Sequence, residues 1–284
     1  MIMRKRLTIL AIIVVISITW VRPSLAADIT VKGSDTMFIL GQRWAEIYTK
    51  AHPDAKITVA GGGSATGIAA LLKGAADICN SSWPMSAAQT ADFIERFGKR
   101  PRQYKMCMDA VAIFVNKANS IEKLSLTQIG KIYTGKISNW KEVGGKDAPI
   151  SLYGRENSSG TYEFFKAHVL NRQDFAPATK AMPGTAAVIQ VVAGDPNAIG
   201  FGGIAYDHGV KHLAISRTPS SGAFAPTEVN VYADRYPLAR YLFSYVKSEK
   251  DVDAVADYIT WCLSDAGQAV VQEVGYFPLP KNLR

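Results

Sequence analysis

The chain has 284 residues, of which 48% are hydrophobic and 20% are charged, so it can bury one large core or two smaller lobes. Its formal net charge is +8, and four of its positive charges, Arg4, Lys5, Arg6 and Arg22, fall within the first 26 residues. The remainder is only mildly basic and has no basic run, which argues against a nucleic-acid-binding protein and suits an anionic ligand.

The first 26 residues have the three parts of a secretory signal peptide. The charged segment Arg4–Arg6 precedes the apolar segment Leu7–Trp20, whose fourteen residues are too few for an ordinary membrane span. A small-x-small cleavage site, Ser24-Leu25-Ala26, follows. We therefore predict cleavage after Ala26 or Ala27 and export to the periplasm. Because no cysteine stands at the cut, no lipid anchor to the membrane is expected.

The exported part begins with a strand, a polar loop and a helix. Asp28–Lys32 favours a strand, Gly33–Thr36 is the loop, and Met37–Lys50 has apolar residues at helical spacing. Asp35 or Thr36 is expected to cap the helix, which leaves the other hydroxyl and N–H groups of the loop free to face a ligand.

A second unit of the same kind contains a glycine-rich loop. The β-rich run Ile57–Ala60 is followed by three glycines and then by Ser64, Thr66 and Gly67 at the start of an apolar-periodic helix. Glycines let the backbone approach a ligand, and a helix start presents unpaired N–H groups and the positive end of the helix dipole. The loop is either a capped tight turn or part of an anion site.

A third unit consists of the strand Ile150–Arg155, the loop Glu156–Thr161 and the helix Tyr162–Leu170. Arg155 offers a planar fork that can hold two oxygens of an oxyanion. A buried oxyanion needs a hydrogen bond to every oxygen, and three such loops could supply the donors. The candidate donors from the residues alone are Ser34, Thr36, Ser64, Arg155, Ser159, Gly160 and Thr161.

The remaining pattern alternates strands and helices, which predicts an α/β fold with a mostly parallel sheet. Predicted strands cover residues 77–80, 108–116, 198–203 and 229–232, and predicted helices cover 86–97, 126–133, 185–193, 251–263 and 265–274. No single linker divides the chain. We therefore predict two lobes joined by strands that cross near 110–116 and 226–232.

The cysteines and histidines do not predict a metal site. Cys79, Cys107 and Cys262 allow one disulfide with one thiol to spare, and all three pairings are open, including Cys79 with Cys107 from two predicted strands. There is no Cys-x-x-Cys motif, and the four histidines are expected at the surface.

The sequence also gives little support for catalysis. The residues around Ser64 lack the second glycine of a nucleophile elbow, and no nucleotide phosphate loop is present. The stretch Gly200–Ala205 matches a dinucleotide fingerprint only in part and lacks its βαβ context. We predict no catalytic residues, no metal and no cofactor.

Seven motifs, in order along the chain, resemble the periplasmic phosphate-binding proteins of phosphate ABC transporters. They are Gly33-Ser34-Asp35-Thr36, Gly61–Leu71, Asp77–Ser82, Asp109–Ala112, Ile132–Trp140, Arg155–Thr161 and Tyr236–Arg240. The match covers nearly the whole exported chain. Single motifs are weak signals, whereas seven in this order are specific.

The resemblance implies a type II periplasmic-binding-protein fold, in which two α/β lobes close on one phosphate by hinge bending. One lobe would comprise residues 27–112 and 229–284, and the other residues 113–228. A monomer that docks on a membrane ABC permease is expected. The family pattern places ligand contacts on Thr36, the Met37 backbone, Ser64, Arg155, Ser159, Gly160 and Thr161, and we add Ser34 and Ser82 to the predicted set.

Two positions depart from the family. Well-known members have an aspartate, which accepts the proton of the phosphate, where this chain has Ser82, and a related branch has an arginine where this chain has Trp83. A carboxylate acceptor favours protonated phosphate over sulfate, so the choice between these anions stays open, with Ser82 or Asp35 as substitute acceptors. The alternatives are a binding protein or sensor for another tetrahedral oxyanion and a secreted phosphate-ester hydrolase.

Overall fold

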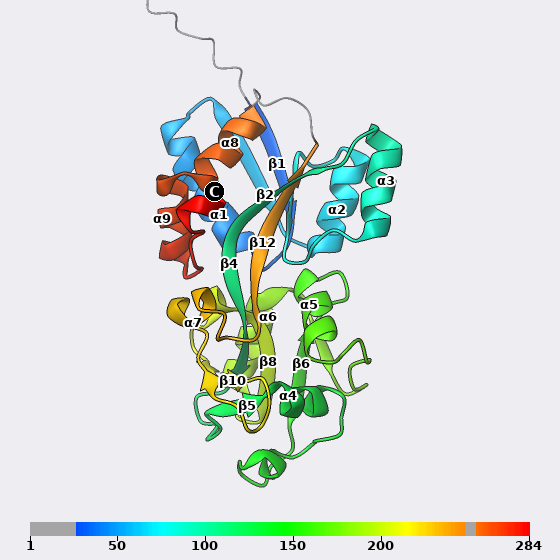
Figure 1. The fold of residues 1–284 in the computed structure, drawn as a ribbon, viewed down its shortest axis with the longest axis vertical. Coiled ribbons are helices and arrows are strands. Elements are labelled where there is room, and N and C mark those ends of the chain that lie inside the picture. Colours follow the sequence, from blue (N-terminus) through cyan, green and yellow to red (C-terminus); the bar gives the residue numbers. More distant parts are fainter. Residues whose placement is uncertain (1–26, 248–253) are drawn as a thin grey trace, which may run out of the picture.

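Two lobes are stacked along the longest axis of the molecule (Figure 1). The computed structural model describes residues 27–247 and 254–284. The predicted signal peptide and the first residues of the predicted helix 251–263 lie outside these ranges. Among the described residues, none of the helices combines the length and apolarity needed to cross a bilayer.

Both ends of the chain build the upper lobe of Figure 1. Its parallel strands pair in the order β2-β1-β3, as expected for strands joined by crossover helices. Helices α1, α8 and α9 cover one side of this sheet, and α2 and α3 lie on the other (Figure 1). The elements are β1 (Ala27–Gly33), α1 (Phe38–Ala51), β2 (Ala55–Ala60), α2 (Ser64–Lys73), β3 (Ile78–Ser81), α3 (Ala87–Phe97), α8 (Ala254–Leu263) and α9 (Asp265–Val274).

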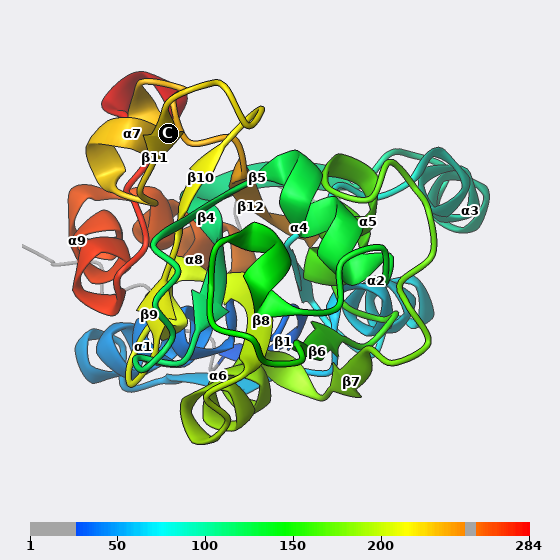
Figure 2. The ribbon, with the colours of Figure 1, turned by 90° about the horizontal axis from the view of Figure 1, so that it is seen from below.

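The middle of the chain builds the lower lobe, where β6 pairs in parallel with β7 and β8. Figure 2, a view from below, shows α6 on one side of this sheet and α4 and α5 on the other. The elements are β5 (Lys123–Ser125), α4 (Leu126–Tyr133), β6 (Ser151–Arg155), α5 (Gly160–His168), β7 (Lys180–Met182), α6 (Gly184–Gly194), β8 (Ala198–Gly203), β9 (Lys211–His212), β10 (Ala214–Ser216) and β11 (Ala223–Phe224). The short helix α7 (Glu228–Tyr232) follows and contacts β4 (Arg102–Val115). Short 3-10 helices cover Trp140–Val143, Ile204–Tyr206 and, at the end of the chain, Lys281–Leu283.

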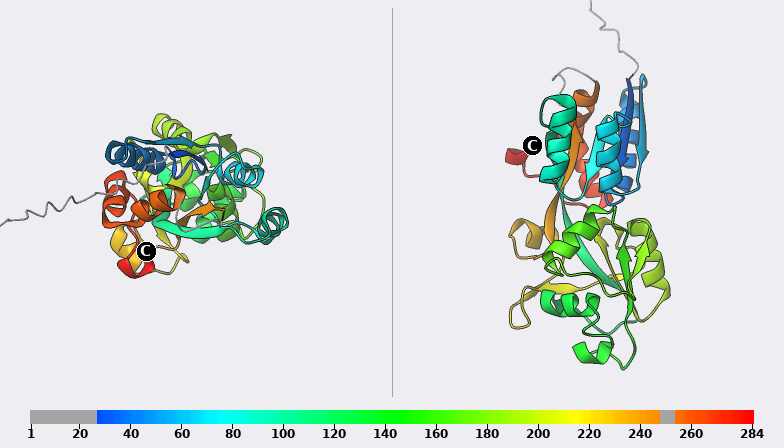
Figure 3. Two further views of the ribbon diagram at one scale, coloured as in Figure 1. Left: turned by 90° about the horizontal axis from the view of Figure 1, so that it is seen from above. Right: turned by 90° about the vertical axis from the view of Figure 1, so that its right-hand side faces the viewer.

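Two long antiparallel strands, β4 (Arg102–Val115) and β12 (Ala239–Val246), join the lobes. Up to Ala110, β4 pairs with β12, and from Val111 onward it pairs with β8 of the lower lobe. Since β12 also pairs with β3, one sheet in the order β2-β1-β3-β12-β4-β8-β6-β7 runs through both lobes. The right-hand view of Figure 3 shows the two strands passing between the lobes.

Most predicted elements are confirmed, and one strand is wrong. Helix α4 has the predicted bounds, and Ser86 caps α3 with a full capping box. Residues 229–232, predicted as a strand, form part of the short helix α7. The backbone carbonyl of Asn230 accepts hydrogen bonds from the N–H groups of Arg235 and Tyr236, which closes this turn. The predicted crossing strand near 226–232 is therefore absent, and the second crossing is made by β12.

Candidate functional site

The three predicted strand–loop–helix units meet where the lobes face one another. The loops that follow β1 and β2 belong to the upper lobe, and the loop between β6 and α5 belongs to the lower lobe. The N–H of Ala65, at the start of α2, donates to the carbonyl of Ser158 across the interface, at 3.0 Å. The carboxyl ends of parallel strands are the usual position for ligand sites in α/β proteins. Loops far apart in sequence are thus brought to one place.

Neither Asp35 nor Thr36 caps α1, which corrects the prediction from the sequence. Met37 occupies the N-cap position, and no side chain caps the helix there. The carboxylate of Asp35 instead accepts from the N–H of Gly62 at 2.8 Å and from Arg155 at 3.0 Å. The hydroxyl of Thr36 is 2.8 Å from the hydroxyl of Thr161 in the other lobe. Both side chains therefore make contacts between loops rather than within their own helix.

Four buried hydroxyl groups form a cluster that spans the interface. Thr36, Ser64 and Ser82 come from the upper lobe and Thr161 from the lower. The Ser82 hydroxyl lies 3.3 Å from that of Ser64 and 3.5 Å from that of Thr161. Buried hydroxyl groups of this kind can donate to the oxygens of an anion without adding charge. The four hydroxyls form a chain in which each lies within 3.5 Å of the next, in the order Thr36, Thr161, Ser82 and Ser64.

The remaining predicted donors are placed in different ways. Ser34 is buried, and its hydroxyl has no hydrogen-bond partner among the described residues. The N–H of Met37 donates to the carbonyl of Ser34 at 3.1 Å. The Ser159 hydroxyl caps α5 by accepting from the backbone of Thr161 and Tyr162. Ser34 is therefore a buried polar group at the site whose hydrogen bond is not made within the described part of the chain.

Arg155 is the buried cation of the third loop, at the end of β6. One terminal nitrogen donates to Thr185 Oγ1 at 2.7 Å and the other to Asp35 Oδ2 at 3.0 Å. Its Nε is buried without a hydrogen-bond partner among the described residues. Burial lowers the pKa of Arg155 from its usual value, and the Asp35 carboxylate opposes this effect. The guanidinium is thus oriented by two contacts, and its Nε–H is available to a further acceptor.

Tyr206 fixes the loop that carries Asp35. Its hydroxyl donates to the backbone carbonyl of Asp35 at 2.7 Å, and burial raises its pKa to about 12. The phenol therefore remains a neutral donor at physiological pH. Because Tyr206 follows β8 in the lower lobe and Asp35 follows β1 in the upper, this bond also links the two lobes.

A second buried ion pair, which was not predicted from the sequence, joins Asp109 of β4 to Arg240 of β12. The Asp109 side chain is fully buried, and Arg240 Nε and Nη2 lie 3.0 and 2.9 Å from Asp109 Oδ2. Arg240 also donates to Thr161 Oγ1 at 2.9 Å and to the backbone carbonyl of Ser82, also at 2.9 Å. Arg240, which β12 carries and Asp109 of β4 orients, therefore contacts the hydroxyl cluster directly.

Gly160 leaves no room for a side chain. A Cβ atom at this residue would lie 2.5 Å from Ser64 Oγ, 2.8 Å from Ser82 Oγ and 2.9 Å from the backbone nitrogen of Trp83. Absence of a side chain at Gly160 is thus what lets the start of α5 approach the upper lobe this closely.

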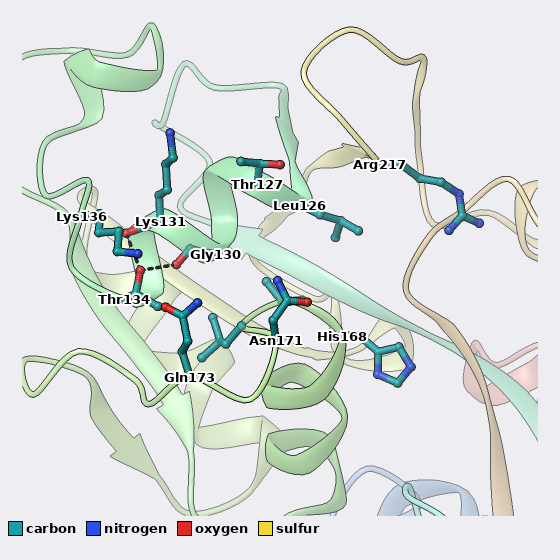
Figure 4. A pocket seen from close by; sticks show the side chains of 12 residues that line it. Leu126, Thr127, Gly130, Lys131, Thr134, Lys136, His168, Asn171, Gln173 and Arg217 are labelled. Atoms are coloured by element: carbon teal, nitrogen blue, oxygen red, sulfur yellow. Dashed lines mark hydrogen bonds between the residues drawn. The ribbon is translucent and has the colours of Figure 1, made fainter.

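A cavity of about 180 Å³ opens beside the cluster, with Ser64, Trp83, Ser158, Gly160 and Glu163 in its wall. A cavity of about 350 Å³ lies elsewhere, over α4 and the end of α5 (Figure 4). Its lining includes Lys131 and Arg217 but none of the predicted ligand residues. The smaller cavity adjoins the hydroxyl cluster, and a further cavity of about 200 Å³ has Arg155 in its wall.

Neither a disulfide nor a cluster of metal-ligating side chains is found in the described part of the chain. Cys79, Cys107 and Cys262 are free and buried. Within residues 27–247 and 254–284, no group of three or more His, Cys, Asp or Glu side chains is placed to hold a metal ion.

A family model and the curated relatives of the chain point to the same family. The model of the PBP superfamily domain matches residues 21–266. The phosphate-binding protein PstS of Pseudomonas aeruginosa is 33% identical in an alignment of 267 residues that covers 88% of this chain and 83% of the relative. PstS of Staphylococcus aureus is 29% identical, with 88% and 78% coverage.

Solved structures agree with these relatives. A candidate phosphate ABC transporter substrate-binding protein with bound phosphate from Clostridium perfringens superposes with a TM-score of 0.81 at 27% identity, covering 89% of this chain and all of the other. An ABC-type phosphate transport receptor from Vibrio cholerae superposes with a TM-score of 0.70 at 29% identity and the same coverage. The predicted two-lobe fold is thereby confirmed.

Proposed function

Because the chain belongs to the PBP superfamily and to the relatives of PstS, we propose that it captures inorganic phosphate between its two lobes and delivers it to an ABC transporter permease. The relatives are named for phosphate binding, and one similar structure carries phosphate. The proposal includes export to the periplasm, action as a monomer and binding without catalysis.

One observation carries this proposal. The buried guanidinium of Arg155, with a donor to spare, lies on a loop that meets the buried hydroxyls of the opposite lobe. A site that surrounds an anion from two sides must assemble and disassemble for the anion to enter and leave, and lobe closure provides that motion. The proposed phosphate contacts are the predicted set: Ser34, Thr36, Met37, Ser64, Ser82, Arg155, Ser159, Gly160 and Thr161.

The charges at the site bear on which oxyanion is bound. Each buried arginine has a carboxylate partner, Asp35 for Arg155 and Asp109 for Arg240. Asp35 reaches the guanidinium that we assign to the ligand, and its side chain is 23% exposed. A carboxylate this close disfavours an anion that has no proton to share. This arrangement supports phosphate, which carries at least one proton at neutral pH, over sulfate, which carries none.

Calorimetric titration of the mature protein, freed of bound anion, tests the function. We expect tight binding of phosphate and no binding of sulfate at neutral pH. Binding of both anions, or of sulfate alone, would favour the general oxyanion-binding alternative, and absence of any phosphate binding would overturn the proposal. Turnover of a chromogenic phosphate ester by the same preparation would instead support the hydrolase alternative.

Replacing Gly160 with alanine should weaken phosphate binding by about 10- to 100-fold, because the added methyl group meets the backbone nitrogen of Trp83, which cannot move cheaply. The matched control is Gly194→Ala at the end of α6, where a Cβ would have no atom within 4 Å. Equal affinities of the two variants in the same titration would show that the lobes do not close at Gly160 when ligand binds.

The extent of each lobe remains a prediction. We place residues 27–112 with 229–284 in one lobe and 113–228 in the other, and the change of partner along β4 at Ala110 and Val111 supports the first boundary. The second proposed boundary falls within helix α7. This helix contacts β4, and the Tyr232 hydroxyl donates to the backbone carbonyl of Pro278 near the end of the chain.

A further inference from the structure

The geometry points to Trp83 as a positioning residue that holds the two lobes closed and so sets how long the ligand is retained. This inference rests on the proposed function, because it concerns release of the bound anion. Trp83 follows β3 of the upper lobe, directly after Ser82 of the hydroxyl cluster. Its role would be to stabilise the closed arrangement, without touching the anion through its side chain.

The indole of Trp83 makes aromatic contacts with the opposite lobe. Its ring meets Phe164 at 6.1 Å between centroids and 74°, and His168 at 5.7 Å and 80°. Both partners lie on α5, four residues apart, and their rings stack on each other at 4.2 Å. Perpendicular aromatic pairs at these separations are attractive beyond the area they bury. Trp83, Phe164 and His168 therefore form a three-ring clamp across the interface.

The clamp is also connected to the buried charge next to the site. The guanidinium of Arg240 lies 5.1 Å from the centre of the Phe164 ring, and the same guanidinium bonds Thr161 and the carbonyl of Ser82. A cation over an aromatic face is a further attractive contact. Ring contacts and ligand-site hydrogen bonds thus depend on one relative position of α5 and the upper lobe.

The placement of the clamp explains why it should act on release. The backbone of Trp83 lies next to Gly160, and Trp83 also lines the cavity beside the site with Ser64 and Glu163. Separation of the lobes would break both ring contacts at once. A contact made only in the closed state increases the population of that state and leaves encounter with the open state unaffected. Loss of the clamp should therefore appear mainly in the dissociation rate.

The test compares three variants of the mature protein. Trp83→Ala removes the clamp, Trp83→Phe keeps an aromatic ring, and Trp261→Ala is the matched control. Trp261, also partly buried, contacts Tyr48 and Tyr258 within the upper lobe. Stopped-flow measurement with phosphate gives association and dissociation rates, and small-angle scattering without ligand reports how open each protein is.

Trp83→Ala is expected to release phosphate about 10- to 100-fold faster, with an association rate within about threefold of the parent protein. Trp83→Phe should recover most of the retention, and Trp261→Ala should match the parent. The ligand-free Trp83→Ala protein should show a larger radius of gyration.

An unchanged dissociation rate in Trp83→Ala, or an equal effect in Trp261→Ala, would overturn the clamp while leaving phosphate binding intact. Failure of the parent protein to bind phosphate would overturn the proposed function instead. The clamp would then be judged on scattering alone, where equal radii for the parent and Trp83→Ala would reject it.

Discussion

Replacing Arg155 with alanine should weaken phosphate binding by about a hundredfold or more, or ~2.7 kcal/mol, because an oxyanion held in a buried site loses its matched cation. The loss is large because the guanidinium is already oriented by Thr185 and Asp35, so binding does not have to order it. Removing it also leaves the Asp35 carboxylate without its buried cation, and this negative charge would disfavour an anion at the proposed site. Calorimetric titration of the variant with phosphate measures the effect.

Two further variants separate the charge of Arg155 from its shape. Arg155→Lys keeps the charge but not the planar fork, so its affinity should lie between those of the parent and Arg155→Ala. Arg43→Ala removes a surface arginine that pairs with Glu46 and Glu273 on the upper lobe, and it should bind as the parent does. A change of less than about tenfold in Arg155→Ala would show that the site has been assigned to the wrong residues.

Replacing Arg240 with alanine should lower the free energy of unfolding by about 3–5 kcal/mol, because Asp109 would be left as a buried charge without its partner. Urea unfolding measures the change. Phosphate affinity should fall as well, since Arg240 holds the hydroxyl of Thr161 and the backbone of Ser82 in place.

Removing both charges should be less harmful than removing one. The double variant Asp109→Asn with Arg240→Met leaves no isolated charge, so its loss of stability should be clearly smaller than the sum for Asp109→Asn and Arg240→Met alone. Lys281→Ala, which removes a partner of Asp265 at the exposed end of the chain, is the surface control and should leave the urea midpoint unchanged. Additive single effects would mean that the buried pair is not the cause.

The parts of the fold that the sequence predicts well are those with local signals. Helix α4 begins after Ser125 with a Ser-x-x-Gln capping box and an apolar face, so its bounds follow from neighbouring residues. The prediction of a strand over residues 229–232 is wrong for the opposite reason. Its alternating valines favour a strand, but hydrogen bonds to the carbonyl of Asn230 from residues five and six positions later decide for a helix.

The site shows the same division between local and distant signals. Glycine and hydroxyl residues at helix starts predict the three loops, which the structure brings together. The pairing of Asp109 with Arg240 joins residues 131 positions apart, and the motifs that contain them give no indication that they meet. A signal was present nonetheless, since each is a charged residue in an apolar strand, and buried charges are almost always paired. The contacts of Asp35 and Thr36 across the interface had no such signal, because both residue types suit a helix cap equally well.

The position of β12 in the sheet has a consequence for the order in which the protein can be assembled. This strand lies between β3 and β4 in the sheet, although it begins more than 120 residues after the end of β4 in the sequence. During synthesis, which starts at the N-terminus, β3 therefore has an open edge until residue 246 has emerged. The strands of the lower lobe, by contrast, are all complete before that point. The half of the molecule that is made first must be finished last, and its unpaired strand edge has to be kept from other chains in the meantime.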